Sequence, residues 1–380
     1  MALLIQDADI PRLAPMGEVV EAMETTLADH SRGAAPIYPR RVNLSARMEG
    51  GSSRYSMGAQ VGIVPRFKIA GIRLNSGRTN RVRGEPRGPR SVGYQNRDWG
   101  IVVLFITETG ELLSIFPQSA ISPIRVGATT GVAVKHLARH DAEVVGVFGT
   151  SRIARCDLEA AAQVRRFKQA KVFSPNPDHR AVFARDMSEK LGFEVVAAAD
   201  PREVVHNSDV ILCSTNSNDP VFDGRWLTPG QLVTSAKSTP RPRAPLTRSF
   251  SKAYPAQEVI YRTEIDRFTL SLADRICVLN QEMMLNENQR ELLDPLEDGT
   301  LSWEKVCELG PVILGESPGR QQPGDLIFYA STGGLGIQMA AAGSVIYRNA
   351  VASGLGMEIP SDWFSADLTP WHEQGFFPSP

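Results

Sequence analysis

The sequence has few cysteines, little net charge and no long apolar run, and each absence argues against a class of protein. Four cysteines stand among 380 residues, at positions 156, 213, 277 and 307, and no two of them form a CxxC pair. This spacing suggests neither a zinc site nor a disulfide framework. The formal net charge is −1, so the chain as a whole offers no field that attracts nucleic acid or an anionic membrane. No apolar run approaches the roughly 20 residues that a membrane-spanning helix needs.

The signs of a targeting segment and of a metal site are also missing. The N-terminus carries no basic region and reaches an acid at Asp7, which is not the pattern of a signal peptide. Among the six histidines, His136 and His140 lie four residues apart without the glutamate of an HExxH motif. We therefore expect a cytoplasmic protein with reduced cysteines and no metal ion.

Short apolar segments alternate with amphipathic ones through the middle of the chain. Helices are predicted over 153–167 and up to residue 191. Strands that are apolar throughout are typical of a parallel sheet covered on both faces. The pattern predicts an α/β fold with a Rossmann-type, doubly wound parallel sheet. The predicted strands are 144–148, 171–173, 194–196, 210–213, 231–234 and 276–279.

The two ends of the chain read differently from this middle part. The N-terminal part predicts a helix at 16–28 and strands at 67–74 and 100–107. Near the other end, a strand at 326–329 and a glycine-rich turn precede a long helix at 337–353. We infer that both ends build one α+β domain, into which the Rossmann unit is inserted. The expected boundaries are 1–122 with 322–380 for the substrate-binding and dimerisation domain, and 123–321 for the dinucleotide-binding domain.

A glycine-containing segment follows the first strand of the predicted Rossmann unit. Gly149 and Ala154 fit the first and third positions of the GxGxxG/A fingerprint, where the first glycine makes a tight turn and the third small residue lets the helix pack closely. The middle position is Ser151, whose Cβ is expected to crowd the pyrophosphate. The start of the following helix offers N–H groups to phosphate. We expect the cofactor to contact Gly149, Thr150, Ser151, Arg152, Ile153 and Ala154.

The end of the second strand indicates which dinucleotide is bound. An acid there would bind the ribose 2′-hydroxyl of NAD, but this chain has Ser174 and Asn176, with Arg180 further on. NADP(H) is therefore the preferred cofactor, with NAD(H) possible, although Ser-Pro-Asn-Pro is also an ordinary turn sequence. Further cofactor contacts are expected after later strands, at Ser214, Thr215, Asn216 and Ser238.

Outside the Rossmann unit, four segments occur in an order that resembles the ornithine cyclodeaminase/mu-crystallin family. They are Pro39-Arg-Arg41, then Met57 followed by Lys68, then the helix entry 121–128 with Arg125, and the turn and helix from Ser331 to Tyr347 that include Gly334.

The resemblance implies a substrate, a site and an assembly. It implies an α-imino or α-amino acid whose carboxylate is held by Arg41, Lys68 and Arg125, with Lys68 and Arg125 as the catalytic residues. Tyr55 and Gly334 are further substrate-binding candidates. A guanidinium fork suits a carboxylate because it donates two parallel hydrogen bonds. The family likeness also implies a homodimer formed through the domain built from the chain ends.

Departures from the family pattern bear on the reaction. Ser238 stands where cyclodeaminases carry an aspartate, Tyr55 where an acid would meet the substrate amine, and Met339 in place of an aspartate in the last helix. The favoured interpretation is an NAD(P)H-dependent imine reductase or amino-acid dehydrogenase. The alternatives are an ammonia lyase that recycles its NAD internally and a non-catalytic NADPH-linked binder of small molecules.

The segment 77–97 is rich in arginine. It carries six arginines and a single acid, Glu85, among several glycines and prolines. It has no aromatic platform for stacking bases, which argues against nucleic-acid binding. Two hypotheses remain open for it: a loop near the substrate pocket that recognises a second acidic group, or a solvated or subunit-contacting loop.

Overall fold

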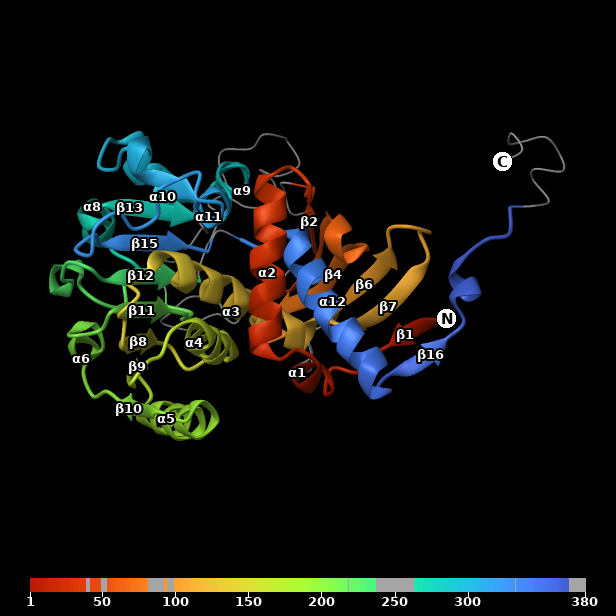
Figure 1. The fold of residues 1–380 in the computed structure, drawn as a ribbon, viewed down its shortest axis with the longest axis horizontal. Coiled ribbons are helices and arrows are strands. Elements are labelled where there is room, and N and C mark those ends of the chain that lie inside the picture. The colour runs from red at the N-terminus through yellow and green to blue at the C-terminus, as the bar shows by residue number, and fades with distance from the viewer. Residues whose placement is uncertain are drawn as a thin grey trace.

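Two sheets with helices packed between and around them make up the fold (Figure 1). The computed structural model describes residues 1–38, 42–48, 53–80, 92–93, 99–217, 219–236, 263–331 and 333–368. One sheet is parallel and the other is mainly antiparallel. Within the described parts of the chain, no helix is both long and apolar enough to cross a membrane.

The parallel sheet confirms the predicted Rossmann-type fold. Its strand order is β10-β9-β8-β11-β12-β15-β13-β14. The four residues of β11, and likewise those of β12, are all buried, as expected for strands covered on both faces. The strands are β8 (Val144–Phe148), β9 (Gln169–Phe173), β10 (Glu194–Ala197), β11 (Val210–Cys213), β12 (Leu232–Ser235), β13 (Arg275–Val278), β14 (Val306–Glu308) and β15 (Ile327–Ala330).

The place of β15 differs from the expectation for the C-terminal part of the chain. The boundary at residue 322 assigns this strand to the domain built by the chain ends, but β15 pairs with both β12 and β13 inside the parallel sheet. All four of its residues are buried, because a central strand is covered from both sides. The chain thus leaves the parallel sheet after residue 330. The division into two domains otherwise stays a prediction.

Helices cover both faces of the parallel sheet. Leu158 and Phe183 contribute to the core on one face, and Val204 and Leu270 to the core on the other. Polar N-caps begin several of these helices, including Asn176 before the proline that opens α5. The helices are α4 (Arg152–Val164), α5 (Pro177–Leu191), α6 (Pro201–Val205), α8 (Arg267–Leu272), α9 (Gln281–Asn286), α10 (Arg290–Glu297) and α11 (Leu309–Ile313), with 3₁₀ turns η3 (Gly224–Trp226) and η5 (Trp303–Lys305).

The second sheet is built from both ends of the chain. Its order is β16-β1-β7-β6-β4-β3-β2, and β5 pairs with β4. A long hairpin of β3 and β4 joins twelve residue pairs, from Ser53↔Asn80 to Val64↔Ile69. The strands are β1 (Ala2–Leu4), β2 (Val42–Arg47), β3 (Ser53–Val64), β4 (Ile69–Asn80), β5 (Val92–Gly93), β6 (Trp99–Ile106), β7 (Leu112–Pro117) and β16 (Met357–Ile359), with the 3₁₀ turns η1 (Pro65–Phe67) and η6 (Ser361–Phe364).

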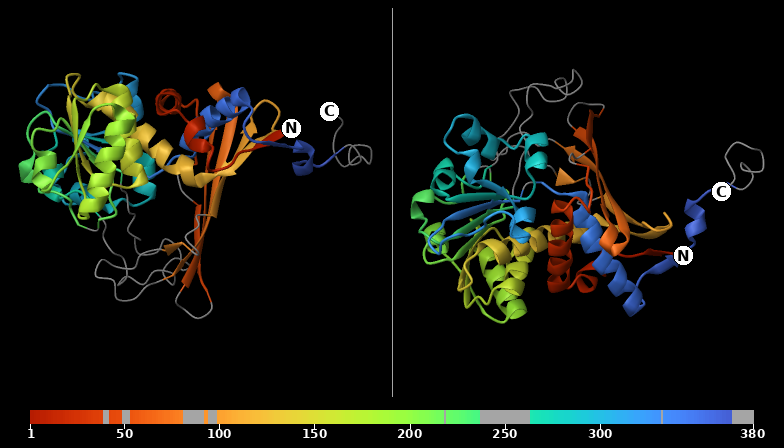
Figure 2. Two further views of the ribbon diagram at one scale, coloured as in Figure 1. Left: turned by 90° about the horizontal axis from the view of Figure 1, so that it is seen from below. Right: turned by 45° about the horizontal axis from the view of Figure 1, so that its top comes forward.

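Three helices lie between the two sheets (Figures 1 and 2). They are α2 (Met16–Ser31), α3 (Gln118–Leu137) and α12 (Gly336–Ser353), and the short α1 (Ile10–Leu13) precedes them. α12 packs on β3 and β4, whereas α3 packs on α4 of the other half of the molecule. The start of α12 touches β3 so closely that a Cβ on Gly62 would lie 2.2 Å from the backbone nitrogen of Ile337. A Cβ on Gly336 would lie 2.0 Å from the Val61 carbonyl oxygen.

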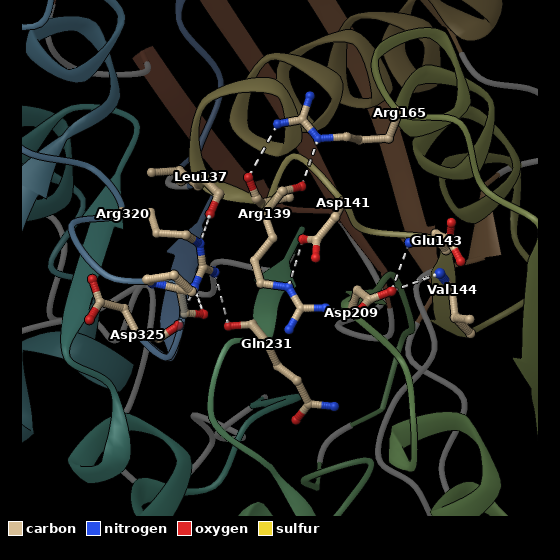
Figure 3. A network of polar contacts seen from close by, with 12 residues as sticks. Leu137, Arg139, Asp141, Glu143, Val144, Arg165, Asp209, Gln231, Arg320 and Asp325 are labelled. Carbon is tan, nitrogen blue, oxygen red and sulfur yellow. Dashed lines mark hydrogen bonds and ion pairs between the residues drawn. The ribbon is translucent and has the colours of Figure 1, made fainter.

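The C-terminal end of α3 is fixed to the parallel sheet by arginine side chains (Figure 3). Arg165 donates to the carbonyl oxygens of Lys135 and Arg139 at 2.8 and 3.0 Å. Arg139 donates to Asp209 at 2.6 Å, and the other oxygen of that carboxylate accepts from the Val144 N–H at 2.9 Å, where β8 begins. The bond to Lys135 satisfies a carbonyl group in the last turn of α3 that has no partner within the helix. Together, these bonds hold α3 in a fixed position relative to the strand that leads to the glycine loop.

Replacement of Gly62 by alanine is expected to disturb the contact between β3 and α12. The new Cβ would overlap backbone atoms that cannot rotate away, so we expect the free energy of unfolding to fall by about 3 kcal/mol or more. Gly77→Ala, on the same hairpin, is the matched control, since its Cβ would lie 3.5 Å from the nearest atom. Chemical denaturation measures both variants. Equal stability of the two would contradict the close contact.

Candidate active site

The turn after β8 has the geometry of a phosphate-binding loop. Gly149 has a φ of 104°, in the left-handed range that favours glycine. Its N–H donates to the Phe173 carbonyl oxygen at 2.9 Å. A Cβ at this position would lie 2.5 Å from the Ser214 carbonyl oxygen. Any residue with a side chain would therefore push β8 and the end of β11 apart, which explains the glycine.

Ser151 caps the helix that follows. Its hydroxyl oxygen accepts from the Ala154 N–H at 3.3 Å and donates to the Ser214 carbonyl oxygen at 3.3 Å. The hydroxyl group is thus bound to the loop's own backbone. Ala154 is fully buried, as expected for the position where helix and strand pack closely. Thr150 and Ile153 are half-buried in the same turn.

Arg152 links the start of α4 to the start of α3. Its Nη1 donates to the Ser119 hydroxyl oxygen at 3.2 Å and to the Ser119 carbonyl oxygen at 3.4 Å. The guanidinium group of this first residue of α4 therefore lies at the N-terminal turn of α3.

The end of β9 carries a cation where an acid would select NAD. Arg180 donates to the Ser174 carbonyl oxygen at 2.8 Å, and its guanidinium carbon lies 5.1 Å from the centre of the Phe173 ring. Asn176 caps α5 by accepting from the His179 N–H at 3.1 Å. The Asn176 side chain thus has a structural task of its own.

Two buried carboxyl groups that were not predicted from the sequence lie beneath the loops that follow β8, β11 and β12. Ser214 donates its hydroxyl to Asp157. Glu264 accepts from the Ser235 hydroxyl at 2.9 Å and from the Thr215 N–H. Asp157 could have been recognised as an acid on the apolar face of a predicted helix. Nothing in the sequence around Glu264 indicates that its side chain is buried. Asn216 is exposed.

The Asp157 carboxyl has an unusual pKa. Burial raises its pKa to about 7, against the opposing effect of hydrogen bonds from Ser214 and Thr130, and the charge of Glu264 raises it further. An acid buried to this extent remains protonated in part at neutral pH.

A second polar cluster surrounds Arg125 on α3. Its Nη1 donates at 3.0 Å to the side-chain oxygen of Gln338. Gln338 is fully buried in the first turn of α12, accepts from the Leu335 N–H at 2.9 Å and donates to the Thr129 hydroxyl at 2.6 Å. A Cβ on Gly334 would lie 2.6 Å from Arg125 Nη1. The structure thus brings together Arg125 and Gly334, two of the predicted substrate residues.

Arg73 on β4, which was not among the predicted site residues, belongs to the same region. Its Nη1 donates to Gln60 at 2.8 Å, and its Nε donates to Gln118. Gln60 also donates to the Gly334 carbonyl oxygen, which connects Arg73 to the Arg125 cluster. We call these residues the arginine–glutamine cluster: Gln60, Arg73, Gln118, Arg125 and Gln338. The cluster brings two arginine side chains into one hydrogen-bonded network with three glutamines.

Lys68 and Tyr55 lie apart from the arginine–glutamine cluster. Lys68 is in the left-handed conformation before β4, its side chain is 62% exposed, and its Nζ lies 2.8 Å from Glu108. Tyr55 bonds to the Ser76 hydroxyl at 2.9 Å and lies on the opposite face of β3 from Gln60, since strand side chains alternate. Two predicted site residues, Arg41 and Ser238, lie outside the described residues, as do positions 81–91 and 94–98 of the arginine-rich segment.

The cofactor loop and the arginine–glutamine cluster lie at the same edge of the parallel sheet. Gly149 follows the carboxyl end of β8, and the chain from Ser331 to Gly334 follows the carboxyl end of β15. Ligands of open α/β sheets bind outside this edge. The arrangement can hold a dinucleotide at the start of α4 and an anionic group of a second molecule at Arg73 and Arg125.

Comparisons with known proteins agree with this geometry. The model of the ornithine cyclodeaminase/mu-crystallin family matches residues 2–250. A Delta(1)-pyrroline-2-carboxylate reductase from Bacillus cereus is 29% identical over 261 residues, which are 68% of this chain and 74% of the relative.

Solved structures share the fold over most of the chain. The Delta(1)-pyrroline-2-carboxylate reductase of Thermococcus litoralis, in complex with NADH and L-proline, has a TM-score of 0.76 and 24% identity, and the match covers 94% of this chain and 100% of that one. An archaeal alanine dehydrogenase dimer with bound NAD has a TM-score of 0.73 and 22% identity, covering 94% and 99% of the two chains.

Proposed function

Because the chain belongs to the ornithine cyclodeaminase/mu-crystallin family, we propose that it is an NAD(P)H-dependent oxidoreductase that acts on the C=N or CH–NH bond of an α-imino or α-amino acid. The observation that carries the proposal is the position of the arginine–glutamine cluster beside the edge of the parallel sheet at which Gly149 lies. The names of the relatives support this reaction class, since they include pyrroline-2-carboxylate and iminosuccinate reductases and an alanine dehydrogenase.

The residues after β8 fit a dinucleotide. Gly149 leaves no room for a side chain, and the turn leads directly into the N-terminus of α4, whose backbone N–H groups suit a pyrophosphate. Arg152, the first residue of α4, carries a cation that bonds to Ser119 on α3. A dinucleotide bound there supplies hydride to an imine carbon or accepts it from an amine-bearing carbon.

Arg125 and Arg73 are our candidates for holding the substrate carboxylate. Gln338 fixes the guanidinium group of Arg125 from the buried side, and Gln60 and Gln118 fix that of Arg73. A carboxylate clamped by preorganised donors keeps its Cα–N bond in one orientation, so that hydride transfer becomes a positioned step. Arg73 takes the part that the family resemblance implied for Lys68, because the Lys68 side chain is exposed and paired with Glu108.

Turnover is tested by following NADH and NADPH oxidation with cyclic ketimine carboxylates, such as Delta(1)-pyrroline-2-carboxylate, and with linear imines formed from 2-oxo acids and amines. We expect substrate-dependent oxidation. Arg125→Ala and Arg73→Ala should each lower kcat/KM by roughly 10- to 100-fold, since a charged hydrogen-bonding partner of the carboxylate is lost. Lys68→Ala is the control and should change kcat/KM by less than about twofold, as an exposed ion pair contributes little.

Other outcomes would decide between this function and its alternatives. Ammonia release from ornithine without net change in the cofactor would identify an ammonia lyase. Dinucleotide binding without turnover of any imine would favour a non-catalytic binder. A loss in Lys68→Ala as large as that in Arg125→Ala, with Arg73→Ala unaffected, would return the substrate role to Lys68.

For the cofactor we propose that NADPH is preferred and NADH accepted. The guanidinium group of Arg180, on α5, reaches Ser174 just after β9, where its charge suits a 2′-phosphate. The solved relatives with NADH or NAD bound establish only which dinucleotide those proteins were seen with.

Arg180→Ala measures this preference. We expect it to weaken NADPH binding by about tenfold and to leave NADH binding within about twofold, because a contact between an arginine and a phosphate is a charge-assisted hydrogen bond. Fluorescence titration gives both dissociation constants. An unchanged ratio of the two constants would count against a role for Arg180 in cofactor choice.

We further propose that two copies of the chain associate through the outer face of the second sheet. This face, defined by Val42, Leu44, Met57, Val61, Ile63, Trp99 and Ile101, is apolar and exposed. The strand register places these side chains on one side of β2, β3 and β6. A contiguous apolar face of this kind marks an interaction surface, and the archaeal alanine dehydrogenase is described as a dimer.

Sedimentation equilibrium tests this interface. We expect twice the chain mass for the wild type and the mass of one chain for Met57→Glu, because a buried carboxylate without a partner is costly in an apolar interface. Val351→Glu, on the exposed side of α12, should remain dimeric. A monomeric wild type, or a dimeric Met57→Glu variant, would exclude this face as the interface.

A further inference from the structure

A buried carboxyl group lies inside the cofactor half of the site and has no part in the proposed reaction. Asp157 is 1% exposed and faces the end of β11 from the second turn of α4. It lies roughly 9 Å along the helix from Ser151, at 1.5 Å per residue. The core on this side of the sheet is apolar. A buried carboxylate in such a core lowers the free energy of unfolding unless it is compensated, so its presence requires an explanation.

Asp157 connects to the phosphate-binding loop through one residue. It accepts the hydroxyl hydrogen of Ser214. The backbone of Ser214 in turn bonds once to the loop and once to the strand before it: its carbonyl oxygen accepts from the Ser151 hydroxyl at 3.3 Å, and its N–H donates to the carbonyl oxygen of Phe148, the last residue of β8, at 2.9 Å. The Ser214 carbonyl oxygen is also the atom against which Gly149 packs. The orientation of Ser214 therefore sets the shape of the loop.

We propose that Asp157 is a positioning residue for the dinucleotide, which holds the phosphate-binding loop through Ser214 and takes up a proton when the dinucleotide binds. The proposal rests on the proposed function, because it requires a dinucleotide at the start of α4. A pyrophosphate placed there brings negative charge close to Asp157 along the same helix. That charge favours the protonated carboxyl, so protonation and binding support each other.

The direction of the pH dependence follows from this linkage. Burial raises the pKa of Asp157 to about 7 before the dinucleotide is present. Below that pH the carboxyl is already neutral and binding needs no proton. Above that pH the Asp157 carboxylate is ionised, and part of the free energy of dinucleotide binding goes into protonating it. The affinity for the dinucleotide therefore falls as the pH rises through 7. For a charge about 9 Å away at an effective dielectric constant of about 20, the pKa moves by roughly one unit, and the affinity changes about tenfold.

The titratable groups around Asp157 come from its own helix and from neighbouring elements. Burial raises the pKa of Cys156 on α4 to about 12, and it raises the pKa of Cys213 on β11 and of Tyr329 on β15 well above their usual values. These three stay neutral between pH 6 and 8.5. Among the described residues, Glu264 also acts on Asp157, and its charge raises the pKa of Asp157.

The experiment measures the dissociation constant of NADH by fluorescence between pH 6 and 8.5, where the pyrophosphate has no titration of its own. For the wild type we expect about a tenfold weakening across this range. Asp157→Asn keeps an acceptor for the Ser214 hydroxyl but cannot ionise, so its affinity should stay near the low-pH value of the wild type throughout. Glu159→Gln, which removes an acid of the same helix that pairs with Lys190 at 2.6 Å, is the control and should follow the wild type.

A second pair of variants separates positioning from charge. Ser214→Ala removes a hydrogen bond that lowers the pKa of Asp157, so the fall in affinity should move to higher pH. Asp157→Leu cannot accept any hydrogen bond and should weaken NADH binding at every pH. Profiles of Asp157→Asn and Ser214→Ala that overlay the wild type would overturn the inference and leave the proposed function standing. Failure of the wild type to bind either dinucleotide at any pH would overturn both.

Discussion

The contact between β3 and the start of α12 is the constraint on which the site depends. Gly62 and Gly336 let the two backbones meet without side chains between them. This contact fixes the distance between the first turn of α12 and the second sheet. Gln338 then reaches Arg125 on α3, while Gln60 reaches the turn that leads out of β15. Because each bond requires the others in register, a small shift of α12 would separate the two arginines from the edge of the parallel sheet.

Much of the fold could be predicted because it is encoded locally. Short apolar segments identified seven of the eight strands of the parallel sheet, all but the three-residue β14. Gly149 was identified by the turn it must make. The place of β15 could not be predicted, since a strand's own residues indicate that it is buried and not which strands flank it. Parts of the hairpin of β3 and β4 were missed because glycine and polar residues interrupt its alternation, and pairing over twelve positions compensates for them.

For the candidate site, the sequence predicted the type of residue better than its position. A cation near Phe67 was expected, and the strand register decides which cation faces the cluster: Arg73 pairs with Gln60 on the inner side, whereas Lys68 precedes the strand and pairs with Glu108. Such a choice depends on register, which a single sequence leaves open. Asp157 and Glu264 were missed for a similar reason, because their partners come from distant segments.

The late position of β15 and α12 in the chain affects how the protein is made. Synthesis delivers β3, β4 and β6 early, but α12, which covers their inner face, begins only at residue 336. The gap between β12 and β13 likewise waits for residues 327–330. Neither sheet can therefore complete its core while the chain is still growing. An unfinished chain exposes apolar strands on both sheets, so premature termination anywhere before α12 leaves an aggregation-prone product rather than a smaller folded unit.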